Sequence, residues 1–431
     1  MDELKKKMVA ALRWSERYTK TDMLYLAKGG FWITFGRIMG AGSGFLLTLL
    51  LANTISKEAL GNYKFIQSFA GIITAFSLTG MGTAIIQSVA RGNDGVVRQG
   101  FKTFLSWSVL MTVVAWGSAV YYFIQGNVAL GWSLVIIGIT IPFSQAGSFF
   151  SPFLIGKKEF KTETIFGVVY TITPLLATGI VSLFTAATPF LVMAFFGISA
   201  LTGMIFYKIT LTRYNPPQKT ESKMLTYGKH LSVINVLGSI SMQLDRLLVF
   251  HYLGAVQMAL YTIALAAPQQ LRFGSKLLAT ISLPKFSAAD PLPLYKTLPR
   301  KALLVFCGAL SIVLFYIAIA PWFFTFFFPN YIEAIRYSQV FSLVILFFPA
   351  VLFQQFLVGQ MQQKWLYILQ TIVPATKILL LFILLPVYGI WGALISIITM
   401  EFVRLIIIVS IFFKLSKDAQ KISYNTPTIE N

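Results

Sequence analysis

Long apolar segments alternate with short polar ones along almost the whole chain. Twelve of them are long enough to cross the hydrocarbon core of a bilayer as helices, which takes about 20 residues. They cover residues 29–52, 63–86, 103–124, 128–155, 164–185, 189–210, 230–252, 256–281, 302–328, 337–358, 366–386 and 388–413. The pattern predicts an all-α integral membrane protein with about twelve transmembrane helices around a central cavity.

The first of these segments, Gly29 to Thr54, carries a charge within an otherwise apolar stretch. Gly36, Gly40 and Gly44 are spaced four apart, so they share one helix edge that a neighbouring helix can approach closely. Arg37 lies beside this edge, and a charged residue inside a span usually faces a protein interior or a water-filled cavity. We expect the glycine edge to pack on a neighbour and Arg37 to face the central cavity.

The distribution of basic residues predicts the topology. If the N-terminus is cytoplasmic and the spans alternate, most of the 35 Lys and Arg residues fall in inner segments. The outer segments hold only Lys57, Lys64 and Arg336. This asymmetry follows the positive-inside rule, so both termini are predicted to be cytoplasmic in the cell membrane.

The longest polar interval between spans lies midway along the chain and contains Pro216 and Pro217. A shift of 198 residues aligns Gly40 with Gly238, Ser43 with Ser241, and Tyr63 with Tyr261. We therefore predict two six-helix halves that are parallel repeats. The predicted segments are a basic cytoplasmic N-terminus at 1–28, a first half at 29–212, a linker at 213–229, a second half at 230–413 and a cytoplasmic tail at 414–431.

Composition narrows the function. Only 12% of residues are charged, against about 25% in soluble domains, and the formal net charge is +20. The cations are spread over short inner segments and form no single basic stripe, which argues against nucleic acid as a partner. One cysteine excludes an intrachain disulfide, and two histidines with no CxxC or HExxH pattern predict neither a metal site nor a cofactor. No catalytic arrangement is evident, so we expect a protein that is not an enzyme.

The charges left inside the spans are the candidate site. The cations there are Arg37, Arg246, Lys377 and Arg404, and the carboxylates are Asp245 and Glu401. A cavity with this positive excess attracts a lipid-borne phosphate or diphosphate. The polar candidates for sugar contacts are Asn235, Ser241, Gln67, Gln145, Gln354 and Gln355. Structural alternatives stay open, because Asp245 can pair with Arg246 or another helix, and Glu401 can pair with Arg404 three residues on.

Four segments together resemble the polysaccharide or O-antigen flippases of the multidrug/oligosaccharidyl-lipid/polysaccharide (MOP) exporter superfamily. They are SKEALGNYKFIQSFAGIITAFSLTGMGTAII in the first outer turn and second span, PFLIGKKEFK after the fourth, QLDRLLVFHYLGAVQMALYTIALAAPQQL in the seventh and eighth, and FFTFFFPNYIEAIRYSQVFSL after the ninth. The resemblance covers nearly the whole chain through the order and spacing of these segments.

The resemblance implies a transporter that moves a polyprenyl-diphosphate-linked oligosaccharide from the inner to the outer leaflet by alternating access. It also implies membrane lipids as neighbours, and a polysaccharide polymerase and a chain-length regulator as candidate partners. Coupling to a proton or sodium gradient is common in the superfamily, and Asp245 and Glu401 are the candidates for it. The alternatives are an ion-coupled multidrug or cation antiporter of the same fold and, less favoured, a membrane glycosyltransferase, polymerase or ligase.

Overall fold

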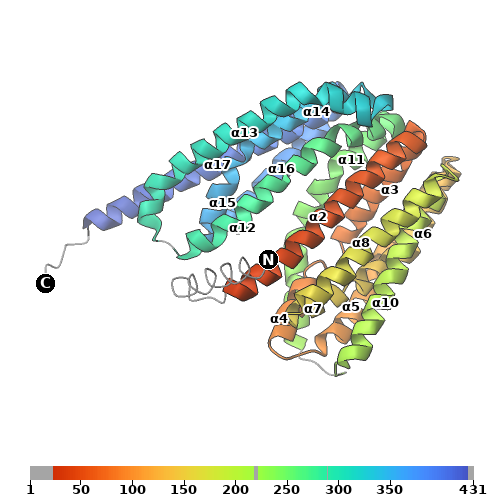
Figure 1. The fold of residues 1–431 in the computed structure, drawn as a ribbon, viewed down its shortest axis with the longest axis horizontal. Coiled ribbons are helices and arrows are strands. Elements are labelled where there is room, and N and C mark those ends of the chain that lie inside the picture. Colours follow the sequence, from red (N-terminus) through yellow and green to blue (C-terminus); the bar gives the residue numbers. More distant parts are fainter. Residues whose placement is uncertain (1–22, 218–221, 289, 426–431) are drawn as a thin grey trace, which may run out of the picture. The chain divides into compact units, whose positions relative to one another are not determined.

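The computed structural model describes residues 23–217, 222–288 and 290–425, and every regular element in them is helical (Figure 1). The helices are α2 (Met23–Thr54), α3 (Lys57–Ala75), α4 (Met81–Ala90), α5 (Val96–Ile124), α6 (Val128–Gly147), α7 (Phe150–Gly156), α8 (Phe160–Ser182), α9 (Thr188–Val192), η1 (Met193–Gly197), α10 (Ile198–Tyr214), α11 (Ser222–Leu271), α12 (Phe273–Ala288), α13 (Pro291–Phe327), η2 (Pro329–Tyr331), α14 (Ala334–Ser342), η3 (Leu343–Phe347), α15 (Pro349–Gly359), α16 (Gln363–Tyr388) and α17 (Ile390–Asn425). The all-α class predicted from the sequence is confirmed.

Ten helical stretches in the described part of the chain are long and apolar enough to cross a membrane. One of them, Val236–Ser287, has 52 residues, and at 1.5 Å per residue it is more than twice as long as the roughly 30 Å hydrocarbon core. Gly254, with φ 83° and ψ 179°, divides it where the sequence predicted a turn between two spans. The protein is therefore a multi-pass membrane protein with ten to twelve apolar helices.

The second predicted span, 63–86, is not one continuous helix. The structure divides it into α3 and α4, and residues 76–80 between them form a chain of tight turns. Ser77 donates its hydroxyl to the carbonyl oxygen of Thr74 (2.6 Å), and the amide of Gly80 donates to the hydroxyl of Ser232 (2.9 Å). These side-chain hydroxyls satisfy backbone groups that a continuous helix would have paired, so the apolar pattern alone could not reveal the break.

The chain forms two compact units. Unit 1 contains residues up to Leu50 and Ile73–Asn235, and unit 2 contains Leu51–Ile72 and Val236–Asn431. In unit 1, α6 packs against α5 and α10; in unit 2, α12 packs against α15 and α16 against α17. The predicted halves at 29–212 and 230–413 stay a prediction, since compactness alone does not establish a repeat. Residues 1–22, 218–221 and 426–431 of the predicted terminal segments and linker lie outside the described residues.

Within unit 1, α2 and α8 run side by side in the same direction. A Cβ added at Gly36 would lie 3.4 Å from Cγ2 of Thr164, and one added at Gly40 would lie 3.4 Å from Cγ2 of Thr171. The predicted glycine edge is thus confirmed at these two positions, whereas an added Cβ at Gly44 has no described atom of another helix within 4 Å. The parallel direction agrees with the predicted topology, in which the first and fifth spans both run outward.

Within unit 2, α3 and the first part of α11 pack antiparallel at very short range. The backbone of Gly61 lies against the carbonyl group of Ala255, so closely that no Cβ fits between them. The rings of Phe65 and Phe250 stack with centroids 3.9 Å apart. Further along the same contact, the side chain of Gln243 on α11 lies against Gly71 of α3.

We predict that Gly61→Ala destabilises the protein, because the added methyl group would overlap the Ala255 carbonyl oxygen and force α3 and α11 apart. Overpacking of this kind costs about 1–3 kcal/mol. Thermal unfolding of the purified protein in detergent should show a lower Tm. The matched control is Gly42→Ala, a helical glycine with nothing within 4 Å of an added Cβ, where Tm should stay unchanged or rise. An unchanged Tm for Gly61→Ala would contradict the close packing.

Candidate functional site

A buried ion pair links α11 and α16 in unit 2. Lys377 Nζ lies 3.2 Å from Oδ1 of Asp245, and the two residues are 7% and 4% exposed. The ammonium group also donates to the carbonyl oxygen of Ser241 (2.5 Å), and the hydroxyl of Tyr261 donates to Oδ2 of Asp245 (2.5 Å). Ser241 and Asp245 are four residues apart, so they present their oxygens on one face of α11. Both carboxylate oxygens of Asp245 are therefore occupied by donors.

Arg246, the next residue, makes a different set of contacts. Its guanidinium donates to Oε1 of Gln243 (3.3 Å) and, at 3.5 Å, to Oε1 of Gln269. Gln243 lies against the bare backbone of Gly71 on α3, where an added Cβ would be only 2.9 Å from its Cγ. Successive residues on a helix point about 100° apart, so α11 directs Asp245 and Arg246 to different neighbours.

Lys64 is a cation on α3, the helix that packs against the first part of α11. Its ammonium donates to Oε1 of Gln67 (3.2 Å), and Gln67 in turn donates to the hydroxyl of Tyr63 (3.0 Å). Gln67 lies one turn before Gly71, on which Gln243, a partner of Arg246, packs, so Lys64 and Arg246 both lie along the contact between α3 and α11. We call Lys64, Asp245, Arg246 and Lys377 the Asp245 cluster; it holds three cations and one carboxylate.

A second group of charges lies around Glu401 of α17. This carboxylate is 1% exposed and lies 3.1 Å from Nη2 of Arg272 and 2.8 Å from Nη2 of Arg404. Arg272 occupies the break between α11 and α12. We call these three residues the Glu401 cluster. Here too the cations outnumber the carboxylate, so both clusters in unit 2 carry a positive excess.

The structure brings some of the predicted site residues together and leaves others apart. Arg246, Lys377, Asp245, Ser241 and Gln67 all belong to or touch the Asp245 cluster, while Arg404 and Glu401 form the internal pair that the sequence left open as an alternative. Asn235 lies outside the residues whose side chains are described. Gln145 lies on α6 and Gln354 on α15, and neither side chain hydrogen-bonds to another described residue. Which of these residues contact a substrate stays a prediction.

Arg37 lies on α2 in unit 1, and its side chain is exposed. Among the residues that the structure describes, Arg37 forms no ion pair. Of the other predicted cavity cations, Lys377 and Arg404 each pair with a carboxylate, and Arg246 does not. Because it follows Gly36 by one residue, it points about 100° away from the face that packs on α8. Its predicted role as a cavity cation stays open.

Several members of these clusters were not predicted from the sequence. Lys64 was counted among the outer cations and not among the site residues; it lies on α3, seven residues after the helix begins at Lys57. Gln243, Gln269 and Arg272 were not singled out. Tyr261 could have been proposed as a site residue from the sequence, because the 198-residue shift aligns it with Tyr63. In the structure both tyrosines are fully buried and hydrogen-bonded to a polar residue of unit 2.

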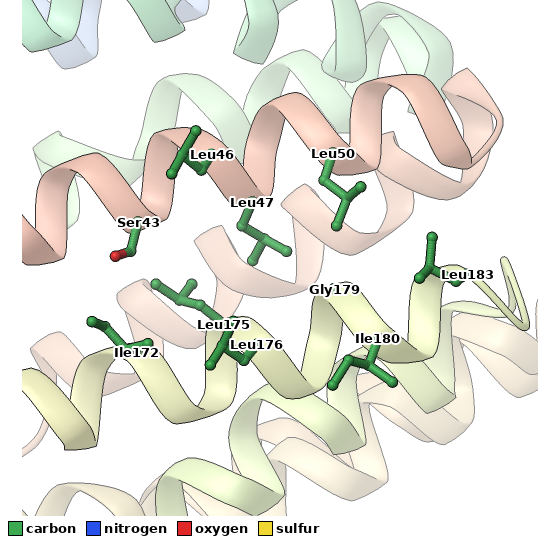
Figure 2. A pocket seen from close by; sticks show the side chains of 10 residues that line it. All are labelled: Ser43, Leu46, Leu47, Leu50, Ile172, Leu175, Leu176, Gly179, Ile180 and Leu183. Atoms are coloured by element: carbon green, nitrogen blue, oxygen red, sulfur yellow. The ribbon is translucent and has the colours of Figure 1, made fainter.

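A separate pocket lies between α2 and α8 in unit 1, beyond the point where Gly40 contacts Thr171 (Figure 2). Its volume is about 270 Å³. The lining residues are Ser43, Leu46, Leu47, Leu50, Ile172, Leu175, Leu176, Gly179, Ile180 and Leu183. With Ser43 as its one hydroxyl, this pocket suits a hydrocarbon chain and offers no charge to a phosphate. In the described part of the chain, no three His, Cys, Asp or Glu residues are grouped to hold a metal ion.

Solved transporter structures share this fold. A multidrug resistance MATE family transporter of the MOP superfamily, in its inward-facing conformation, aligns with a TM-score of 0.67 at 15% identity and covers 88% of this chain and 95% of that chain. The lipid II flippase MurJ, in an inward closed conformation, aligns with a TM-score of 0.66 at 13% identity over 94% of each chain. A MOP superfamily transporter from Pyrococcus furiosus Vc1 (DSM3638) aligns with a TM-score of 0.59 at 14% identity, over 90% and 96%. These likenesses establish the fold of MOP superfamily transporters.

The family of the protein is established by its amino-acid sequence. Residues 26–282, more than half of the chain, match the family described as polysaccharide biosynthesis protein. The chain belongs to that family. No curated protein sequence matches it significantly.

We predict that Lys377→Met destabilises the protein strongly, because it leaves the carboxylate of Asp245 buried without its cation. Removing one partner of a buried pair costs about 3–5 kcal/mol. The double variant Asp245→Asn with Lys377→Met should recover most of this loss, which a double-mutant cycle of thermal unfolding measures. The control is Lys364→Met, an exposed lysine on the same helix. Equal Tm values for the two single lysine variants would show that the pair is not a buried contact.

Proposed function

We propose that this protein is a flippase that moves a polyprenyl-diphosphate-linked oligosaccharide from the inner to the outer leaflet by alternating access, for surface polysaccharide biosynthesis. Membership of the polysaccharide biosynthesis protein family supports the pathway class. The shared fold with MOP transporters, among them a lipid II flippase, supports transport as the activity.

The observation that carries the proposal is the positive excess of the Asp245 cluster. A diphosphate is a polyanion, and it loses its hydration when it enters a membrane protein, which costs free energy unless cations and donors replace the water. The Asp245 cluster supplies that compensation, because it holds three cations, Lys64, Arg246 and Lys377, and only one carboxylate. The amides of Gln67, Gln243 and Gln269 add groups that can hydrogen-bond sugar hydroxyls.

Alternating access has support from the solved relatives. Both an inward-facing and an outward-facing conformation of a multidrug resistance MATE family transporter of the MOP superfamily align with this chain, with TM-scores of 0.67 and 0.60. In our proposal the lipid tail stays in the bilayer while the diphosphate and glycan cross through the protein. A polymerase and a chain-length regulator would act on the product at the outer face. Asp245 and Glu401 remain the candidates for coupling to a proton or sodium gradient.

A multidrug or cation antiporter is the competing function, because the MATE relatives share this fold. Such a transporter needs carboxylates to attract its substrate. Both buried carboxylates of unit 2, Asp245 and Glu401, are instead neutralised by neighbouring cations. The charge balance therefore favours an anionic substrate over a cationic one.

Reconstituted protein should translocate a labelled polyprenyl-diphosphate sugar across liposome membranes, measured by access of an impermeant reagent to the sugar. We predict that Arg37→Ala slows translocation by about tenfold, the effect of losing one charge-assisted hydrogen bond. The matched control is Arg336→Ala, an exposed arginine on α14, which should transport at the wild-type rate. Transport by Arg37→Ala at the wild-type rate would remove Arg37 from the mechanism, and no transport by wild-type protein would refute the proposed function.

The same liposomes separate the two functions. With a cationic dye as substrate and an imposed proton or sodium gradient, we predict no dye transport above that of protein-free liposomes, because the buried clusters repel cations. Gradient-driven dye efflux would instead support the antiporter.

A further inference from the structure

The aliphatic pocket between α2 and α8 is a groove that follows the two helices over several turns (Figure 2). On α8 its lining residues recur at i, i+3, i+4, i+7, i+8 and i+11 from Ile172 to Leu183, which is the spacing of one helix face. At 1.5 Å per residue this side of the groove is roughly 16 Å long. On α2 the lining runs from Ser43 to Leu50, about 10 Å. A groove of this shape fits an extended chain that lies along the helices.

A helix contact closes one end of the groove, and a glycine leaves its floor open. The two helices touch where an added Cβ on Gly40 would lie 3.4 Å from Cγ2 of Thr171, and the groove begins directly after this contact. An added Cβ on Gly179 would lie 3.0 Å from Cδ2 of Leu50 and 3.7 Å from Cδ1 of Leu47. A side chain at position 179 would therefore project into the groove.

The rim of the groove is open, whereas its floor is buried. Leu46, Leu176, Ile180 and Leu183 on the rim are all more than half exposed, and Leu47 on the floor is only 6% exposed. Both helices are long and apolar enough to cross a membrane. The rim therefore lies at the depth of the hydrocarbon core, where a lipid chain can enter the groove.

The groove lies toward the outer end of both helices. Ser43 is eleven residues and Leu50 four residues from the end of α2 at Thr54, and Leu183 directly follows the end of α8. The topology expected from the positive-inside rule makes these the outer ends of the two spans. The stretches outside the described residues, 1–22, 218–221, 289 and 426–431, belong to inner segments in that topology, so they do not reach the groove.

Water does not fill such a space. A buried water needs two to four polar partners, and the lining offers one side-chain hydroxyl, that of Ser43. An empty groove would lose dispersion contacts along its whole lining. A dry apolar cavity of about 150 Å³ holds benzene, with six carbons. The volume of about 270 Å³ therefore has room for about ten carbons, which is part of one acyl chain.

Abundance decides which chain fills a groove that has no polar group to select its ligand. One hydroxyl cannot distinguish one lipid from another, so occupancy follows mass action among the chains present. Phospholipid chains are the solvent of a membrane protein, whereas a lipid-linked oligosaccharide is a minor component of the bilayer. Mass action therefore favours a phospholipid chain.

We propose that the groove between α2 and α8 is a binding site for one acyl chain of an outer-leaflet phospholipid, which enters over the rim and lies along the helices with its end at Ser43. The chain completes the packing of α2 on α8 just before α2 passes from unit 1 to unit 2, between Leu50 and Leu51. This inference goes beyond the proposed function and does not depend on it, because any phospholipid bilayer supplies the chain.

Photolabelling of the full-length protein in liposomes of phosphatidylethanolamine and phosphatidylglycerol tests the site. The probe is a trace of phosphatidylethanolamine with a diazirine on its acyl chain, and mass spectrometry identifies the labelled residues. We expect labelling of Leu47, which bilayer lipid reaches only through the groove. The positive control is the exposed Leu201 on α10, and the negative control is the fully buried Leu134 on α6. Labelling of Leu201 without Leu47 would overturn the site, as it would if a second copy of the chain covered the groove.

Side chains that fill the groove should exclude the lipid. Gly179→Leu adds a side chain next to Leu47 and Leu50, and Ser43→Leu fills the end of the groove near the Gly40 contact. In each variant the labelling of Leu47 should fall at least about tenfold, which corresponds to the exclusion of about two methylene groups. Unchanged labelling of Leu47 in either variant would overturn the site.

The matched control is Gly167→Leu on the same helix, where an added Cβ meets only the side chain of Glu163 one turn earlier. Its labelling of Leu47 should equal that of the wild type. A cooperative thermal unfolding transition shows that each variant is folded, and Ser43→Leu, an apolar substitution inside a span, keeps the test decisive if Gly179→Leu does not fold.

Two further probes test the identity and the depth of the chain. A polyprenyl phosphate with a diazirine in its isoprenoid chain should label Leu47 no more than the phospholipid probe does, and labelling by the isoprenoid probe alone would overturn the phospholipid as occupant. A phospholipid with the diazirine at the end of its acyl chain should label Ser43 more than Leu50, because the chain of an outer-leaflet lipid ends near the middle of the membrane. The opposite order would overturn the outer-leaflet origin.

Discussion

The ion pair between Asp245 and Lys377 is the interaction on which the charged interior of unit 2 depends. It joins α11 to α16, and it is completed by the Ser241 carbonyl and the Tyr261 hydroxyl. Because a buried carboxylate needs a cation or several donors, Asp245 is committed to this pair. The guanidinium of the adjacent Arg246 hydrogen-bonds instead to the neutral amides of Gln243 and Gln269.

Close helix packing joins α3 to α11. Gly61 and Gly71 have no side chains, so α11 approaches α3 closely enough for the backbone of Ala255 and the side chain of Gln243 to rest on them. The same principle operates in unit 1, where Gly36 and Gly40 bring α2 against α8 and leave the aliphatic pocket beyond them. In an apolar solvent helices associate through such packing and through polar contacts, since burial of apolar surface gains little there.

Helix breaks contribute to the same arrangement. Arg272 lies where α11 gives way to α12, and its guanidinium reaches Glu401 on α17. Tyr261 lies just after the turn at Gly254, so it can reach back to Asp245 on the preceding span. The positive excess of the two clusters, the transporter fold and the family are together the physical basis of the flippase proposal.

The all-α membrane class with ten to twelve apolar helices was predictable from the sequence, as were the close contacts of Gly36 and Gly40 with a neighbouring helix. The positions of Asp245, Arg246, Lys377, Glu401 and Arg404 within long apolar helices were predictable as well. Hydropathy and helical periodicity are local properties that can be read from the sequence. A charged residue within an apolar segment is recognisable because placing a charge in hydrocarbon costs free energy. The partners of these residues were not predictable. Asp245 pairs with Lys377, 132 positions away, and not with its sequence neighbour Arg246. This pairing depends on which helices are in contact in the folded protein. The same holds for Gln243, which lies against Gly71 only because α3 packs on α11. The sequence by itself determined which charged residues lie in apolar helices, where burying a charge costs free energy. Only the tertiary structure decided which of these residues pair with an opposite charge, because partners such as Asp245 and Lys377 come from helices far apart in the sequence.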